Sequence, residues 1–127
     1  MTMHTDRIGR LLIVECEGSI SSADAAATLR DTVTSESDIR TIVVDFSKVD
    51  YVTRTGVAVL AYLQRWAQEC NVQLKLFNPS RSVRHMLKQA GSIFQFDFAS
   101  LDETMALVIR ADYELQLSNG GQLQHQA

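Results

Sequence analysis

The chain has little of the chemistry on which catalytic and metal-binding proteins depend. Its 127 residues include only two cysteines, three histidines and one proline. Cys16 and Cys70 stand in apolar runs without a CxxC spacing, which predicts two buried thiols in a reducing compartment. The histidines are not spaced with a nucleophile or with one another as a triad or a metal site would require. We therefore expect no metal, no cofactor and no enzyme activity.

Long apolar runs and a basic excess are also missing. No stretch approaches the roughly 20 apolar residues that span a bilayer. The first apolar run, residues 11–14, is interrupted by Glu15 and Glu17 and lacks a signal-peptide cleavage pattern. The net charge of −3 provides no cationic field for binding many phosphates. We expect a cytoplasmic protein that neither inserts into a membrane nor binds nucleic acid as its main ligand.

Composition and the order of residue patterns together indicate one α/β domain. Hydrophobic residues make up 46% and charged residues 21% of the chain, which is ordinary for a globular protein of this length. Strand-like and helix-like patterns alternate through the middle of the sequence, which predicts parallel strands joined by right-handed crossovers. We assign residues 1–117 to the domain and the polar residues 118–127 to a flexible C-terminal tail.

Four segments have the pattern of strands. RLLIVECEGSI (residues 10–20) predicts a buried strand that ends near Gly18, and TIVVDF (residues 41–46) predicts a central strand. VQLKLF (residues 72–77) alternates in polarity, which is typical of a strand with one wetter face. IFQFDF (residues 93–98) predicts a last short strand.

Four segments are predicted to be helical. Ser21 or Ser22 caps the first, Asn78 caps the third before Pro79, and Gly91 follows the end of that third helix. The second helix follows the central strand, and the fourth opens with a capping box of Ser100 and Glu103. The side chains predicted to face the core are Ala25, Leu29, Val33, Val59, Tyr62, Leu63, Trp66, Ala67, Cys70, Val83, Leu87, Ala90, Met105, Val108 and Ile109.

The strongest functional signal is the turn Thr53-Arg54-Thr55-Gly56, between the central strand and the second helix. A helix N-terminus has unpaired N–H groups and a partial positive charge, so a hydroxyl there can accept a hydrogen bond and an anion is stabilised. A phosphoryl group on Thr55 would add roughly −1.5 to −2 charges beside Arg54. The alternative interpretation is structural: Thr55 is a cap worth about 1 kcal/mol, and Gly56 serves only a tight turn.

The stretch TIVVDFSKVDYVTRTGVAVLAYL, preceded by LLIVECEGSI and followed by VQLKLFNPSRSVRHMLKQAG, resembles the STAS domain family, named for sulfate transporters and anti-sigma factor antagonists. The likeness covers about residues 8–110. It implies an α/β fold with a mixed, mostly parallel sheet of about four or five strands and about four helices. It also implies a protein partner, an anti-sigma factor that is a serine/threonine kinase and phosphorylates its antagonist.

The family's motif is a strand-end acid followed by Asp-Ser-Ser/Thr-Gly, of which the second hydroxyl residue is phosphorylated in antagonists. The resemblance places Asp45 at the strand-end acid, Thr55 at the phosphoacceptor and Gly56 at the motif glycine. By this resemblance the turn and the start of the following helix form the partner surface, and phosphorylation releases the partner.

Three positions depart from the family's pattern. Thr53 stands where the family usually has an acid, Arg54 where it has a serine, and Ser21 where it has a second acid. These departures favour the alternative of a STAS scaffold, or a cytoplasmic subunit of a transporter or signalling complex, that binds its partner constitutively. A domain that binds a small anion at the same helix N-terminus, modification of Thr53 in place of Thr55, and a homodimer are further options that the sequence leaves open.

Overall fold

The structure is a computed structural model that describes the backbone of residues 1–90 and 96–126, and the side chains of residues 1–89 and 96–118. Within those ranges the chain forms one five-stranded sheet and four helices. The strands are β1 (Thr2–Ile8), β2 (Leu11–Ile20), β3 (Thr41–Val52), β4 (Gln73–Phe77) and β5 (Phe98–Ala99), and the helices are α1 (Ala23–Thr34), α2 (Arg54–Glu69), α3 (Arg81–Ala90) and α4 (Leu101–Gln126).

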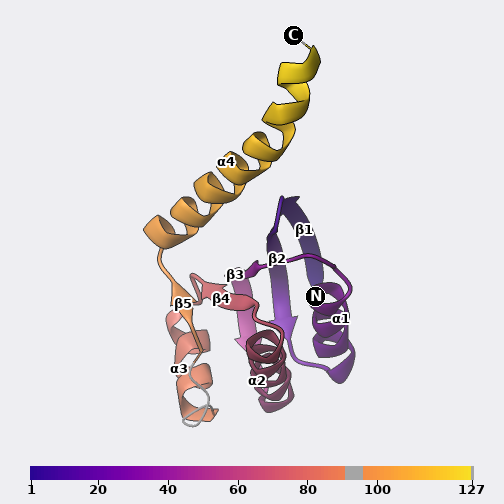
Figure 1. The fold of residues 1–127 in the computed structure, drawn as a ribbon. Coiled ribbons are helices and arrows are strands. Elements are labelled where there is room, and N and C mark those ends of the chain that lie inside the picture. The colour runs from indigo at the N-terminus through magenta and orange to yellow at the C-terminus, as the bar shows by residue number, and fades with distance from the viewer. Residues whose placement is uncertain (91–95, 127) are drawn as a thin grey trace.

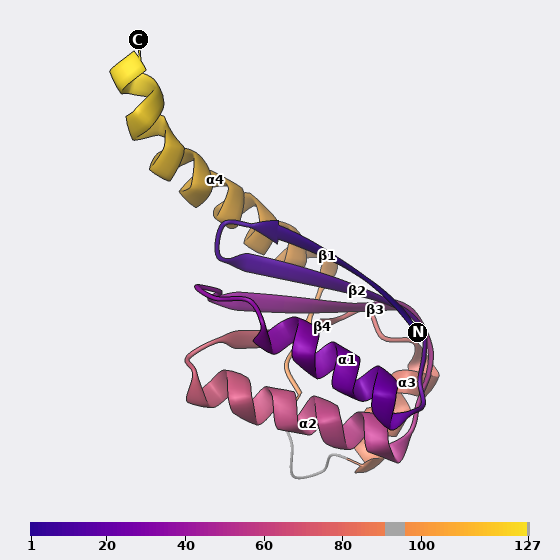
Figure 2. The same ribbon diagram turned by 90° about the vertical axis from the view of Figure 1, so that its right-hand side faces the viewer.

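The strands follow one another in the sheet in the order β1-β2-β3-β4-β5. β1 pairs antiparallel with β2, and all later pairs are parallel. Helices α1 and α2 cover one face of the sheet and α4 crosses the opposite face, while α3 packs beside β3 and α2 (Figures 1 and 2). This arrangement confirms the predicted mixed, mostly parallel α/β fold.

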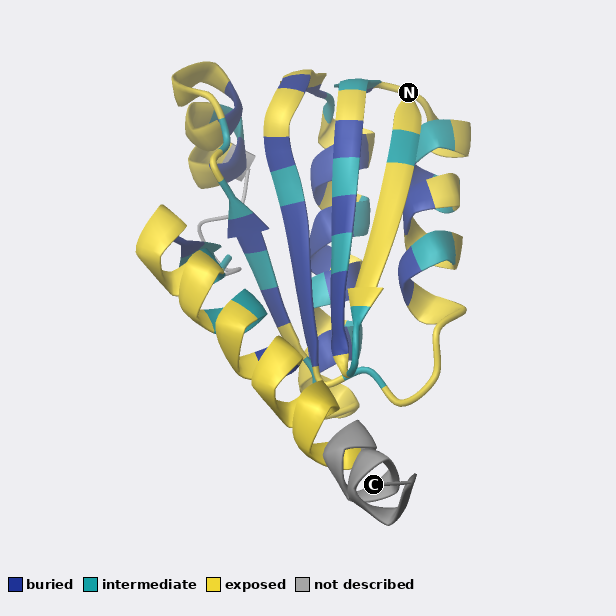
Figure 3. Ribbon diagram, turned by 90° about the horizontal axis from the view of Figure 1, so that it is seen from above, coloured by how far each residue is buried: buried dark blue, intermediate teal, exposed yellow. Residues whose placement is uncertain are grey.

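Two cores lie on the two faces of the sheet. The larger one contains the fully buried Phe46 and fills the space between the sheet and the helices α1, α2 and α3. The smaller one joins Leu11 and Val43 of the sheet to Ala111 of α4. The outer surface of α4 is exposed (Figure 3), and its side chains Leu101, Met105, Ile109, Tyr113 and Leu117 are 50 to 64% exposed. Helix α4 is therefore held on one side only.

Both long strands extend further than the sequence predicts. β2 continues beyond Gly18 to Ile20, and β3 continues beyond Phe46 to Val52. The register between them shifts twice, the second time at Gly18, whose φ is 102°. A glycine in this left-handed region permits a bulge, so the paired strand continues where an end was predicted.

Strand β1 has no counterpart among the predictions. Its side chains are mostly exposed, because it lies at the edge of the sheet, and so it lacks the apolar alternation that identifies a strand. Ile8 pairs with Leu11 across a turn of Gly9 and Arg10, and Gly9 has a φ of 58°. Gly9, which can adopt the left-handed conformation of a tight turn, is the residue from which this hairpin could have been predicted.

The helix caps are partly as predicted. Ser22 accepts a hydrogen bond from the Ala25 N–H (3.0 Å), and Ser100 accepts one from the Glu103 N–H (3.1 Å). The third prediction is wrong: Ser80 caps α3 by accepting from the Val83 N–H (3.2 Å), whereas Asn78 and Pro79 precede the helix. Asn78 has a φ of 53° and belongs to the turn after β4. Gly91 lies outside the described residues.

Several predicted inward side chains are not buried. The predicted core position of Tyr62 is wrong, since this side chain is 55% exposed. The buried stripe of α2 runs through residues 56, 60, 63 and 67, so the helix is rotated by about one residue from the predicted orientation. Met105 and Ile109 are exposed, whereas the predicted Val108 packs against the smaller core together with Leu107, which was not predicted. In α1 the buried alanine is Ala26, not Ala25; the other predicted core residues of α1 and α3 are buried where described, namely Leu29, Val33, Val83 and Leu87.

Two predictions concern the end of the chain. β5 covers Phe98–Ala99, and most of the predicted strand 93–98 lies outside the described residues. Helix α4 continues to Gln126, through most of the segment that the sequence assigns to a tail; the flexibility of residues 118–127 stays a prediction. Among the described residues, no helix combines the length and apolarity needed to cross a membrane.

The two cysteines differ in exposure, contrary to the prediction that both are buried. Cys16 is buried in β2 and Cys70 is exposed at the end of α2. We expect a thiol reagent such as DTNB to label one cysteine of the native protein rapidly, and the second only after unfolding. Mass spectrometry of the labelled peptides should place the fast label on Cys70; fast labelling of Cys16 would contradict the described packing of β2.

Candidate functional site

The Thr53 turn lies where β2 and β3 end and α1 and α2 begin. Ile20, the last residue of β2, pairs with Val52, the last residue of β3. The Thr53 N–H donates to the Ile20 carbonyl (3.0 Å), and the Thr53 hydroxyl donates to the same oxygen (3.3 Å). Ser21, exposed, follows Ile20 directly. The structure therefore brings Ser21 and the turn to one edge of the sheet.

Thr53, and not Thr55, caps α2. Its hydroxyl accepts a hydrogen bond from the Gly56 N–H (3.2 Å), and its carbonyl accepts one from the Val57 N–H (2.9 Å). The sequence-based interpretation of Thr55 as the cap is wrong, because Thr55 lies inside the first turn of the helix. Its side chain is exposed, and its hydroxyl makes no hydrogen bond to any described residue. Capping therefore does not account for Thr55.

Gly56 is required by close packing. A Cβ atom at this position would lie 2.7 Å from the Ile20 carbonyl oxygen and 2.8 Å from Val52 Cγ1. Gly56 itself is buried against the strand ends. The motif glycine thus lets α2 approach the two strands, which fixes the position of the first helical turn.

The first turn of α2 contains no acidic residue and one cation, the exposed Arg54. The N–H groups of Arg54 and Thr55 lie at the start of the helix, where no intrahelical acceptor is available. Cation, helix dipole and free hydroxyl together suit this turn to receive an anion or a phosphoryl group. No group of three or more metal-ligating side chains occurs in the part of the chain that is described.

Asp45 does not join this site. It lies within β3, beside Glu15 of β2, and roughly 15 to 20 Å of strand separate it from the Thr53 turn. Its carboxylate accepts hydrogen bonds from the Ser47 N–H (2.9 Å) and hydroxyl, and Ser47 in turn accepts one from the Asn78 amide (3.1 Å). Asp45 therefore ties β3 to the turn after β4. The resemblance places Asp45 at a strand end, whereas β3 continues to Val52, so Asp45 lies inside the strand and away from the Thr53 turn.

A groove beside the turn was not predicted. It has a volume of about 190 Å³ and lies between the end of β3 and α3. Tyr51, 51% exposed, and the half-buried Met86 line it together with His85. The sequence signal was Tyr51, an aromatic residue two positions before the turn, but it lies beyond residues 41–46, where the predicted strand ends. The groove adjoins the turn through Val52, the residue directly before Thr53.

The comparisons with known proteins agree with this geometry. A model of the STAS domain matches residues 2–110. The structure of the anti-sigma factor antagonist SpoIIAA in its unphosphorylated form superposes with a TM-score of 0.64 at 17% identity, over 84% of this chain and 94% of that one. A serine-to-glutamate variant of RsbS from Moorella thermoacetica has a TM-score of 0.66 at 16% identity, over 87% of this chain and 97% of that one.

A membrane protein also contains this fold. The structure of the murine anion transporter Slc26a9 has a TM-score of 0.66 at 21% identity, over 83% of this chain but only 18% of that one. No curated protein matches the sequence. The structural likenesses concern the fold, whereas the family match spans most of the sequence. On that match, the chain belongs to the STAS domain family.

Proposed function

We propose that this protein is a regulatory binding protein of the anti-sigma factor antagonist type, whose Thr53–Gly56 turn and adjoining α2 form the partner surface. In this proposal Thr55 is the residue that a partner kinase phosphorylates, and the added charge releases the partner. The protein acts in the cytoplasm and is not an enzyme. The observation that carries the proposal is the exposed Thr55 hydroxyl in the first turn of α2, without a structural partner among the described residues.

The contrast between the two threonines supports Thr55 over Thr53 as the acceptor. The half-buried Thr53 hydroxyl both donates to Ile20 and accepts from Gly56, so phosphorylation there would break the cap and the link to β2. Modification of Thr55 breaks no described hydrogen bond. A kinase therefore reaches Thr55 at a lower cost in folding free energy.

The release step follows from desolvation. A phosphoryl group on Thr55 would be stabilised in water by the start of α2 and by Arg54. Burying the same dianion against a partner would remove its hydration. The interface forms with the unmodified threonine and would have to compensate the added charge. Release on phosphorylation is therefore expected even though the modified turn is itself stable.

The test is affinity capture from native cytosol on immobilised wild-type protein and on Thr55→Glu. We expect a kinase-like partner to be retained by the wild type and lost from Thr55→Glu, at least about tenfold in recovered partner, because the carboxylate introduces an unmatched charge at the interface. Incubating the captured partner with ATP and wild-type protein should then give a phosphopeptide that contains Thr55, and Thr55→Ala should abolish it.

The matched control is Thr34→Glu. It makes the same change at the opposite, C-terminal end of α1, on an exposed side chain, and should leave partner recovery unchanged. Equal retention of the same partner by wild type and Thr55→Glu would refute the switch.

The second candidate function is a constitutive STAS scaffold, or a cytoplasmic subunit of a transporter or signalling complex. Thr53, Arg54 and Ser21 favour it, because they stand where the family usually has an acid, a serine and a second acid. The likeness to the STAS-containing anion transporter structure also agrees with it. In that case a transport or signalling protein would be captured equally by wild type and Thr55→Glu, and no phosphopeptide would form.

A further inference from the structure

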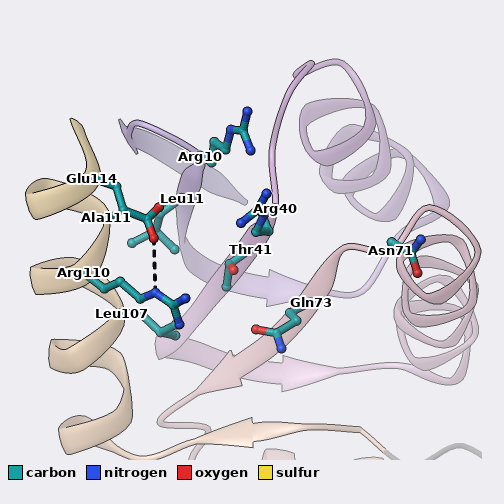
Figure 4. A pocket seen from close by; sticks show the side chains of 10 residues that line it. All are labelled: Arg10, Leu11, Arg40, Thr41, Asn71, Gln73, Leu107, Arg110, Ala111 and Glu114. Atoms are coloured by element: carbon teal, nitrogen blue, oxygen red, sulfur yellow. Dashed lines mark hydrogen bonds and ion pairs between the residues drawn. The ribbon is translucent and has the colours of Figure 1, made fainter. Parts of the chain in front are cut away.

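A second hollow, with a polar lining, lies at the opposite end of the strands from the Thr53 turn. It has a volume of about 350 Å³ and opens between the first residues of β2, β3 and β4 and one side of α4 (Figure 4). Sites for small molecules commonly start at about 300 Å³. The hollow shares no lining residue with the Thr53 turn or with the groove beside it.

Three arginines surround this hollow. Arg10 and Arg40 stand directly before β2 and β3, and Arg110 reaches it from α4 (Figure 4). Backbone hydrogen bonds fix the positions of Arg10 and Arg40. The Arg10 carbonyl accepts from the Arg40 N–H (2.8 Å), and the Arg40 carbonyl accepts from the Gln73 N–H (2.9 Å). Neighbouring parallel strands thus hold two guanidinium-bearing residues side by side, in a chain whose net charge is −3.

The positive charge of the hollow is only partly neutralised. Arg110 pairs with Glu114 at 3.2 Å, and Arg10 approaches Asp38 at 3.5 Å. Both pairs are exposed to solvent, where an ion pair contributes little to the free energy of folding. Among the side chains of residues 1–89 and 96–118, no carboxylate lies within ion-pair distance of Arg40. Three arginines therefore line the hollow together with one carboxylate, that of Glu114.

The inner part of the hollow is less polar and offers one hydroxyl, that of the largely buried Thr41. Thr41 is nine-tenths buried and lines the hollow, and its hydroxyl donates to no group in the described part of the chain. Leu11, Leu107 and Ala111 complete this inner wall. A ligand seated here would meet guanidinium groups at the rim and a hydroxyl with apolar side chains further in.

We propose that this hollow is a binding site for a small molecule carrying phosphoryl oxygens with two or more negative charges, held by Arg10, Arg40 and Arg110. The planar guanidinium fork matches phosphate oxygens in bidentate pairs, which a single ammonium does not. The site is independent of the Thr55 switch, because it lies at the other end of the strands.

The test is a titration of the ¹⁵N-labelled full chain with inorganic pyrophosphate at constant ionic strength, followed by amide chemical shifts. We expect saturable shifts at Leu11, Thr41 and Ala111. Arg40→Gln should weaken binding at least about tenfold, because it removes a charged hydrogen-bond donor. Arg110→Gln, on an exposed position of α4, should also weaken binding without affecting the sheet.

Arg30→Gln is the matched control, since Arg30 is exposed on α1 and pairs with Asp31 away from the hollow; its affinity should equal that of the wild type. Absence of saturation in the wild type, or an affinity equal to that of the wild type in both Arg40→Gln and Arg110→Gln, would overturn the proposal. Shifts confined to the first turn of α2 would overturn it as well, and would assign anion binding to the Thr53 turn instead.

Discussion

Replacing Gly56 by alanine is expected to lower the free energy of unfolding by about 2 kcal/mol. The added methyl group would lie 2.7 Å from the Ile20 carbonyl oxygen, 2.8 Å from Val52 Cγ1 and 3.0 Å from Ile20 Cγ2. Neither the backbone oxygen at a paired strand end nor a buried β-branched side chain can move cheaply, so α2 must shift outward. Overpacking commonly costs about 1 to 3 kcal/mol, and contact with two rigid groups puts this site near 3, of which the better helix propensity of alanine returns about 1.

Thermal or urea unfolding followed by circular dichroism measures this effect, and a loss of about 2 kcal/mol should lower the melting temperature by roughly 6 °C. The matched control is Thr55→Ala, the neighbouring exposed position, which should change stability by less than about 0.5 kcal/mol. A Gly56→Ala protein as stable as the wild type would mean that α2 is not seated against Ile20 and Val52 as described.

The wild-type protein is expected to lose about 2 to 3 kcal/mol of stability between pH 9 and pH 11 through Cys16 alone. Burial raises the pKa of the Cys16 thiol from its ordinary value of 9.0 to about 12, with smaller contributions in the same direction from the charges of Asp45 and Glu15. Above pH 9 the thiol of the unfolded chain releases its proton while the buried thiol keeps it. The unfolded state then binds fewer protons than the native state, so stability falls as pH rises, by up to about 1.4 kcal/mol per pH unit.

Denaturant unfolding at several pH values checks this, with Cys16→Ala and Cys70→Ala compared with the wild type. Cys16→Ala is less stable than the wild type at pH 8 because it removes buried atoms, and the gap should narrow by about 2 kcal/mol at pH 11. Cys70→Ala removes the exposed thiol and should keep the wild-type slope. A gap between wild type and Cys16→Ala that stays constant with pH would show that the Cys16 thiol ionises as readily in the native protein as in the unfolded one.

The fold class and the place of the switch candidate could be predicted from the amino-acid sequence. A short, β-branched apolar run such as residues 41–46 favours a buried strand, and the cap residues Ser22 and Ser100 accept hydrogen bonds from N–H groups three residues further on. Each of these signals depends only on residues within a short segment, so the sequence of that segment is enough to detect it. The turn with Thr55 was found on the same basis, because helix starts have a recognisable chemistry.

The role of each residue at that turn depends on the folded arrangement of distant segments. The pairing of β2 with β3 places the Ile20 carbonyl where Thr53 can donate to it, and this bond holds Thr53 at the start of α2. The same pairing places Ile20 and Val52 against Gly56. The register depends on two strands and the bulges between them, so it cannot be obtained from either segment alone.

The same limit applies to the arginine hollow and to the face of α4. Arg10, Arg40 and Arg110 are each ordinary surface residues in sequence, and become neighbours only because parallel strands start at one edge and a helix crosses beneath them. Local propensity and periodicity, which can be read from the amino-acid sequence, are sufficient to predict most of the helices and strands. Contacts between distant segments depend on long-range packing that no short segment encodes.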